Sequence, residues 1–311
     1  MGHNHQHSHA HDHSDLLHGK SSRLFITILL NVAITVGQFF GGIISGSIAL
    51  LSDALHNFSD VISLVISYIA SRLSGKEASF ERSYGYKRAE ILAAFINSLS
   101  LIGIAIFLVV EAVERLGKPL VINSDIVIFF AIASIVLNLL SVLILHKDSK
   151  GNMNIKSAYL HLMTDVMTSV AVLIGGILMK YYEIYWFDSL LSLLIAIYLI
   201  YSTVPLLWDS VKILMQFSPK DVNLETIIEE VSQIEGVKNM HHIHIWNLND
   251  NSVMLEAHLE MEKDCTLSEF QELLFSVEKI LKYNGVNHSN IQPELNKCKD
   301  NLSPIAKEER H

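Results

Sequence analysis

Cysteine and charge are both scarce in this 311-residue chain. Only two cysteines occur, Cys265 and Cys298, and they form no CxxC pair, which argues against a thiolate zinc site or a disulfide framework. Charged residues make up 18% of the chain and hydrophobic residues 50%, a composition too apolar for an ordinary soluble domain of this size. The net charge of −9 argues against nucleic acid as a partner. The composition therefore predicts an integral membrane protein.

Long apolar runs are what the sequence does contain. A hydrocarbon core of about 30 Å takes roughly 20 helical residues to cross, and six runs are long enough. They cover residues 24–45, 48–71, 89–111, 124–146, 157–180 and 187–208. Ser45-Gly46-Ser47 separates the first two, so a tight helical hairpin is expected there. Lys and Arg favour cytoplasmic loops, and their concentration on one side of the predicted spans places both termini in the cytosol.

The pattern divides the chain into five parts. Residues 1–22 form a His-rich cytosolic tail, 23–208 the six-helix transmembrane bundle, 209–221 a linker, 222–297 a cytosolic domain of soluble composition, and 298–311 a polar tail. Periodicity within the cytosolic domain predicts helix, strand, strand, helix and strand in that order. An αββαβ order indicates a small α+β sandwich.

Two pairs of the form HxxxD lie inside the predicted spans. His56 and Asp60 share one face of the second span, and His161 and Asp165 share one face of the fifth. Each ionisable group at membrane depth costs about 2.5–3.5 kcal/mol, so four of them need a compensating role, which a bound cation supplies. Because these spans run in opposite directions, the pairs can face each other head to tail.

Two imidazoles and two carboxylates suit Zn²⁺ in a tetrahedral site, whereas Mg²⁺ or Ca²⁺ would want more oxygen ligands. The alternative is that each His is a satisfied interhelical hydrogen-bonding group and each Asp an isolated proton relay. Binding requires neutral His and ionised Asp, so loading the metal releases protons and protonation releases the metal. The ligand chemistry therefore predicts metal–proton antiport.

Several longer stretches resemble the cation diffusion facilitator family, in its bacterial-type zinc transporter branch. They are GGIISGSIALLSDALHNFSD at 41–60, YGYKRAEILAAFIN at 84–97, LNLLSVLILH at 137–146, SAYLHLMTDVMTSV at 157–170 and HHIHIW at 241–246. The resemblance covers nearly the whole chain. It implies a homodimer in the bacterial inner membrane, a ferredoxin-like fold for the cytosolic domain, and His56, Asp60, His161 and Asp165 as the transport ligands.

The resemblance also implies a regulatory metal site at His241, His258 and Glu294, with His242, His244 and His288 nearby. Strand parity, however, puts His241 on the face of Ile243 and Ile245 and leaves His242 or His244 to accompany His258. The set that the resemblance implies therefore needs a bend at the start of the strand. The loop between the second and third spans contains no His, so a loop metal site found in some relatives is expected to be absent.

Several other polar residues have more than one possible role. Asp53, one turn before His56, is either a partner that orients an imidazole or carries a proton, or a residue near the outer mouth that faces water. Asn31, Gln38, Asn97 and Asn138 are expected to form interhelical hydrogen bonds of about 0.6 kcal/mol each. The alternating histidines of residues 3–13 are expected to capture zinc weakly, unless the tail is only a solubilising segment or a tag remnant.

The sequence thus predicts a proton-coupled exporter of divalent metal, with Zn²⁺ foremost and Cd²⁺ and Co²⁺ as further substrates. Zn²⁺ is expected as the substrate, with a regulatory role in the cytosolic domain as a further possibility that the resemblance raises, and no organic cofactor is expected. The alternative is a metal-sensing membrane scaffold that does not transport. An enzyme is not expected, because a membrane metalloprotease would need a general base as in HExxH, and that motif does not occur.

Overall fold

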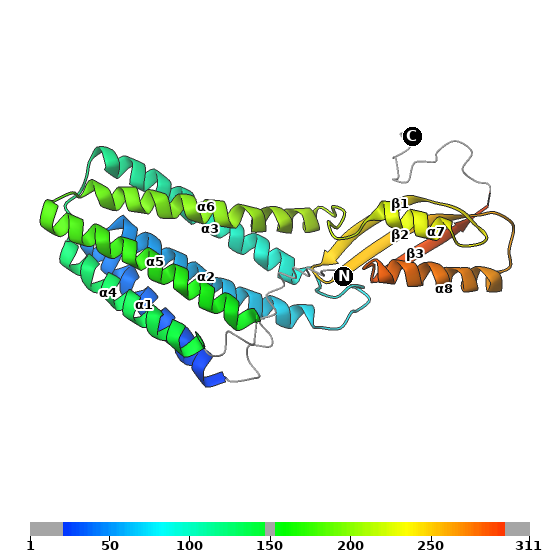
Figure 1. Ribbon diagram of the computed structural model, residues 1–311, viewed down its shortest axis with the longest axis horizontal. Helices are drawn as coiled ribbons and strands as arrows, with labels where there is room; N and C mark the ends of the chain where they lie inside the picture. Colours follow the sequence, from blue (N-terminus) through cyan, green and yellow to red (C-terminus); the bar gives the residue numbers. More distant parts are fainter. Residues whose placement is uncertain (1–20, 147–152, 296–311) are drawn as a thin grey trace, which may run out of the picture.

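Six helices, packed as a bundle, precede a small α/β domain in the computed structural model, which describes residues 21–146 and 153–295. The α/β domain lies beyond one end of the bundle (Figure 1). The helices of the bundle are α1 Ser21–Ser45, α2 Ile48–Ser74, α3 Ala89–Gly117, α4 Ser124–His146, α5 Met153–Tyr182 and α6 Trp186–Leu214.

Five of these helices, α2 to α6, contain stretches long and apolar enough to cross a membrane. This confirms an integral membrane architecture. In α1, the apolar stretch within the described side chains is Leu29–Ser45, which is shorter than a full span. A sixth crossing therefore stays a prediction. α6 continues to Leu214, so the first residues of the predicted linker are helical.

The hairpin between α1 and α2 forms where the sequence predicts it. Gly46 takes a φ of 77°, a left-handed conformation that costs glycine little. Ser47 then caps α2, because its hydroxyl accepts a hydrogen bond from the backbone N–H of Leu50 at 3.1 Å.

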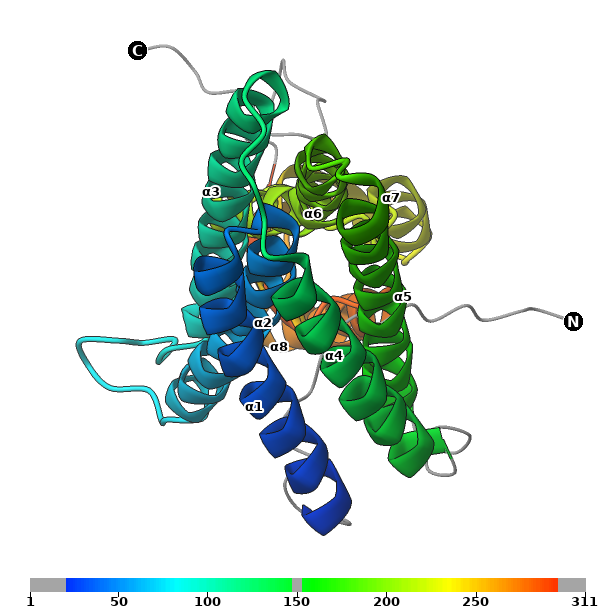
Figure 2. The ribbon, with the colours of Figure 1, turned by 90° about the vertical axis from the view of Figure 1, so that its left-hand side faces the viewer.

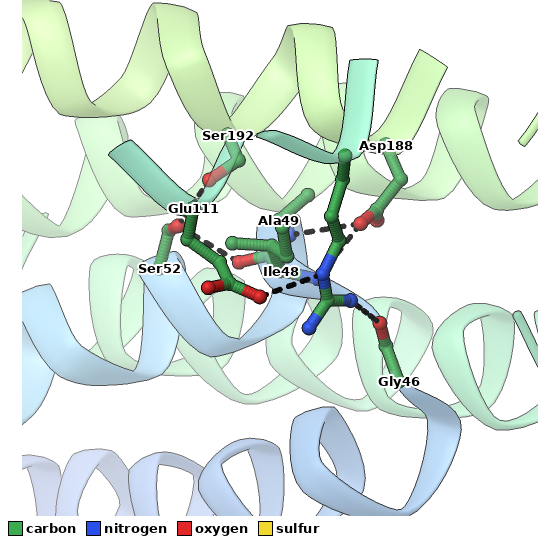
Figure 3. Close-up of polar contacts among 8 residues, drawn as sticks. Gly46, Ile48, Ala49, Ser52, Glu111, Asp188 and Ser192 are labelled. Carbon is green, nitrogen blue, oxygen red and sulfur yellow. Dashed lines mark hydrogen bonds and ion pairs between the residues drawn. The ribbon is translucent and has the colours of Figure 1, made fainter. Parts of the chain in front are cut away.

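The start of α2 is also held by side chains from two other helices (Figure 3). The buried carboxylate of Asp188, at the start of α6, accepts hydrogen bonds from the Ser47 hydroxyl and from the backbone N–H of Ile48, at 2.7 Å in the latter case. Arg115 of α3 donates to the carbonyl oxygen of Gly46 at 2.6 Å and to Glu111 at 2.8 Å. These contacts satisfy backbone groups at the turn and at the start of α2 that the helix itself leaves unpaired, so they fix the start of α2.

α2 is the central helix of the bundle. Viewed end-on, it lies between α3 and α6 on one side and α1 and α4 on the other (Figure 2). Ser52 on α2 shares a hydrogen bond with Ser192 on α6 at 2.7 Å. Groups on the inward faces of α2, such as Asp53 and Asn57, therefore lie in the protein interior, where other helices can contribute partners.

The α/β domain has the predicted αββαβ order. Its elements are α7 Leu224–Ser232, β1 Val237–Asn249, β2 Ser252–Met261, α8 Leu267–Tyr283 and β3 His288–Glu294. The sheet has the order β1-β2-β3, with β1 and β2 antiparallel and β2 and β3 parallel. One apolar core joins the sheet to both helices, as Ile227, Leu259 and Val277 illustrate. A small α+β domain is thus confirmed, and its ferredoxin-like classification stays a prediction.

Candidate metal centres

The HxxxD pair of α2 lies in the middle of that helix. His56 and Asp60 are one turn apart, and Nε2 of His56 lies 3.7 Å from Oδ2 of Asp60. Their side chains are 16% and 34% exposed, so both are partly enclosed by protein. The helical spacing in the sequence therefore does place the two groups on one face, close enough to contact the same ion.

The second pair lies on α5. Asp165 is buried, with 1% of its surface exposed. The backbone of His161 belongs to α5 one turn earlier, but its side chain lies outside the part of the chain that the structure describes. The structure therefore places both pairs on facing helices, and the convergence of all four side chains stays a prediction.

Contacts made by Asp53 fix the height of α2 against α5. Its two carboxylate oxygens accept hydrogen bonds from Thr168 at 3.1 Å and from Ser169 at 3.3 Å. His56 lies three residues further along α2, and Asp165 lies three residues before Thr168 on α5. The two helices run in opposite directions. Three residues forward along α2 and three residues back along α5 therefore lead in the same direction along the bundle, by about 1.5 Å per residue. His56 is therefore level with Asp165.

The same register applies to the other two residues of the HxxxD pairs. Asp60 follows His56 by four residues, and His161 precedes Asp165 by four, so Asp60 is level with the backbone of His161. Each level offers one imidazole and one carboxylate. The two levels lie about 6 Å apart along the helices, and imidazole nitrogens and carboxylate oxygens are donors that Zn²⁺ accepts.

Asp53 itself does not face water. Its side chain is 1% exposed, and Nε2 of Gln38 on α1 donates to it at 2.6 Å. This excludes the water-facing alternative. The sequence indicated Gln38 as an interhelical donor but gave no reason to choose Thr168 or Ser169, although both share the helix face of Asp165. Asn138 differs from expectation, since its amide donates to Ser134 within its own helix, at 3.3 Å.

A second cluster lies on the sheet of the α/β domain, with one member on each strand. Nε2 of His241 on β1 lies 3.3 Å from Glu294 on β3, and Nδ1 of His258 on β2 lies 3.1 Å from the other oxygen of that carboxylate. One ligand atom of each residue lies within 4.8 Å of the others. His241 is buried, and neither of its ring nitrogens makes a hydrogen bond with the described residues. A buried imidazole of this kind suits a metal ligand.

The prediction from strand parity was wrong for His241, and a β-bulge is the reason. His241 pairs with His258, and the next pair is His244 with Glu256, so β1 has one more residue than β2 in this interval. The extra residue is His242, whose φ of 53° marks the bend. The bulge brings His241 onto the face of His258, while Ile243 still points into the core.

The remaining histidines of this region lie beside the cluster or away from it. The His242 ring stacks on His258 with centroids 4.5 Å apart, and His244 contacts His242. His288 is exposed at the start of β3. The histidines of the amino-terminal tail, residues 3–18, lie outside the described residues.

Comparison with known proteins agrees with both parts of the fold. The family profile "Cation efflux transmembrane domain" matches residues 24–215, and "Cation efflux protein, cytoplasmic domain" matches residues 219–295.

Individual relatives match along nearly their whole length. The "Cadmium, cobalt and zinc/H(+)-K(+) antiporter" of Bacillus subtilis is 34% identical over 94% of this chain and 92% of its own. The "Metal cation efflux system protein CzcD" of Cupriavidus metallidurans is 32% identical over 90% and 88%. The "Zinc transporter ZitB" of Pectobacterium atrosepticum is 30% identical over 100% and 94%. With its membrane bundle and its α/β domain both matched, the chain belongs to the cation efflux, or cation diffusion facilitator, family.

Proposed function

We propose that this protein exports divalent metal ions, with Zn²⁺ foremost, in exchange for protons, and that the two HxxxD pairs form its transport site. The observation that carries the site is the register between α2 and α5, which brings His56 level with Asp165 and Asp60 level with His161. The names of the relatives, an antiporter, an efflux protein and a zinc transporter, support the direction and the coupling.

The chemistry of the four groups explains the exchange. A metal-loaded site needs neutral imidazoles and ionised carboxylates, so protons leave when metal enters and displace it when they return. Expelling a doubly charged ion against a potential of 100 mV, negative inside, costs about 4.6 kcal/mol, at about 2.3 kcal/mol per charge. Protons moving inward offset this cost. The relatives named for cadmium, cobalt and zinc make Cd²⁺ and Co²⁺ further candidate substrates.

The cytosolic cluster is proposed as a regulatory zinc site. It offers two imidazoles and one carboxylate, and a fourth position is left for water or another ligand, as in open zinc sites. We also propose six membrane crossings with both termini in the cytosol of a bacterial cell, a ferredoxin-like cytosolic domain, and a homodimer. The match to the cytoplasmic-domain family supports the last two.

Asp165→Ala tests the transport site. In proteoliposomes with an imposed pH gradient, this variant is expected to lose zinc flux while remaining folded, because one of two carboxylate ligands is gone. Asp125→Ala is the matched control, since Asp125 is an exposed acid at the start of α4 that pairs with Lys180. Normal flux from Asp165→Ala would refute the site assignment.

A metal-sensing scaffold without transport is the second candidate, and the cytosolic cluster is the observation that favours it. The same vesicle experiment separates the two. A scaffold gives no flux from the wild-type chain under any gradient, whereas a transporter accumulates zinc only when the pH gradient is present.

A further inference from the structure

A row of buried polar side chains crosses the bundle one turn to the outer side of the HxxxD pairs. Asp53 on α2 is at its centre. Gln38 of α1 donates to Oδ2 of Asp53 at 2.6 Å, and Thr168 and Ser169 of α5 donate to Oδ1 and Oδ2 at 3.1 and 3.3 Å. The carboxylate thus joins three helices at one height.

The row continues on both sides of Asp53. Towards α4, the Ser169 hydroxyl shares a hydrogen bond with Ser134 at 2.8 Å. Towards the inner end of α2, the amide of Asn57 donates to the side-chain oxygen of Gln38 at 3.4 Å. Gln38, Asp53, Asn57, Ser134 and Ser169 are all at most 2% exposed. Because these groups are buried, they rely on neighbouring protein groups for hydrogen bonding.

This dependence resists sliding of α2 along α5. A shift of one helical turn is about 5.4 Å, far more than a hydrogen bond tolerates, so it would separate Asp53 from both α5 hydroxyls. Polar groups left unpaired inside a protein are costly, and more so at membrane depth. The contacts of Asp53 therefore select one register out of those that apolar packing alone would allow.

The residue next to Asp53 in the sequence, Ser52, contacts a different helix. Ser52 points to α6, where it bonds Ser192 at 2.7 Å. It joins α2 to a helix that carries no member of either HxxxD pair. Only the Asp53 contacts therefore bear directly on the α2–α5 register.

We propose that Asp53 is a positioning residue of the transport site: by accepting from Gln38, Thr168 and Ser169, it holds His56 and Asp60 at the height of the α5 ligands. It acts through these helices and does not need to touch the metal. The inference rests on the proposed function, since it assumes that the HxxxD pairs carry the ion.

Zinc transport kinetics in proteoliposomes test this role. Asp53→Asn replaces one acceptor oxygen by an NH₂ group, so the three donors can no longer all be accepted, and it is expected to raise the KM for zinc about 10- to 100-fold, as loss of an orienting partner commonly does, with little change in the maximal rate or in the pH-gradient dependence. Ser52→Ala is the matched control, because it removes one interhelical hydrogen bond from the same level of α2. Its KM is expected to equal that of the wild type.

Two results overturn the proposal: an unchanged KM for Asp53→Asn, and a rise for Ser52→Ala equal to that for Asp53→Asn. If the unchanged KM of Asp53→Asn is accompanied by loss of the pH-gradient dependence, Asp53 is a proton carrier instead. If Asp53→Asn does not fold, the double variant Thr168→Val, Ser169→Ala keeps the carboxylate and is expected to raise the KM in the same way; an unchanged KM for it refutes the role.

Asp165→Ala distinguishes failure of this inference from failure of the proposed function. If Asp165→Ala abolishes flux but Asp53→Asn transports with a normal KM, the site stands and only the positioning role falls. If Asp165→Ala transports normally, the site assignment itself is wrong and the positioning role falls with it.

Discussion

Replacing His258 by alanine is expected to abolish stabilisation of the cytosolic domain by zinc. The cluster takes one ligand from each strand, with His241 on the edge strand β1, His258 on the middle strand β2 and Glu294 on β3. A bound ion therefore connects β1 to β3, which exchange no backbone hydrogen bonds with each other. His258→Ala removes the ligand in the middle.

The size of the effect follows from ligand linkage. Zinc at 100 times its dissociation constant stabilises the form that binds it by about 2.7 kcal/mol. For amide hydrogens that exchange only when the domain opens, this slows exchange about 100-fold. The variant retains two of the three ligands and binds far more weakly, so at the same zinc concentration its exchange is expected to be nearly unchanged by the metal.

Hydrogen exchange followed by mass spectrometry on the full chain in detergent measures this directly. Peptides from β1 and β3 report on the cluster separately from zinc bound elsewhere, such as on the amino-terminal histidines. His244→Ala is the matched control, because His244 is exposed on the neighbouring strand β1 and, among the described histidines, its ring contacts that of His242. The reasoning fails if zinc leaves β1 and β3 of the wild type unprotected, or if His244→Ala loses protection equally.

Two further predictions concern helix starts. Asp188→Ala leaves the first N–H groups of α2 without their acceptor and is expected to cost about 1–3 kcal/mol, seen as a lower thermal midpoint in detergent, whereas exposed Asp125→Ala should shift it little. Thr266→Ala removes the cap of α8 and should speed hydrogen exchange there, for a loss of about 1 kcal/mol. The Thr266 N–H and hydroxyl lower the pKa of Glu269 below its ordinary value of 4.5, so this pairing stabilises α8 above that pH and is lost as the pH falls through the lowered value. Glu269→Gln removes the titrating carboxylate, so an acid dependence of α8 exchange that is unchanged in that variant would contradict this assignment.

Local patterns predicted much of the fold, because each depends on residues close in sequence. Ser45-Gly46-Ser47 breaks the apolar run at the observed hairpin, and the four-residue offset of His56 and Asp60 puts them on one helix face wherever the helix lies. The end of α6 was predicted six residues too early, since hydropathy falls at Asp209 while the helix continues to Leu214. Hydropathy reports the membrane boundary, and backbone hydrogen bonding continues past it.

The features that sequence did not predict depend on tertiary contacts. A single additional residue at His242 reverses the face of His241, and parity cannot show a bulge. The partners of Asp53 likewise follow from how α5 lies against α2, which no spacing within either helix determines. Hydroxyls of Thr168 and Ser169 at helical offsets from Asp165 were visible in the sequence, but many buried hydroxyls only bond their own backbone.

The cap that Asp188 places on α2 has a consequence for biosynthesis. The acceptor for the N–H of Ile48 is supplied 140 residues later in the chain. During synthesis, the first turn of α2 must therefore satisfy these groups in some other way until the last helix of the bundle has been inserted. Chains that end before α6 keep that turn incomplete, so its protection from exchange reports whether the whole bundle has assembled.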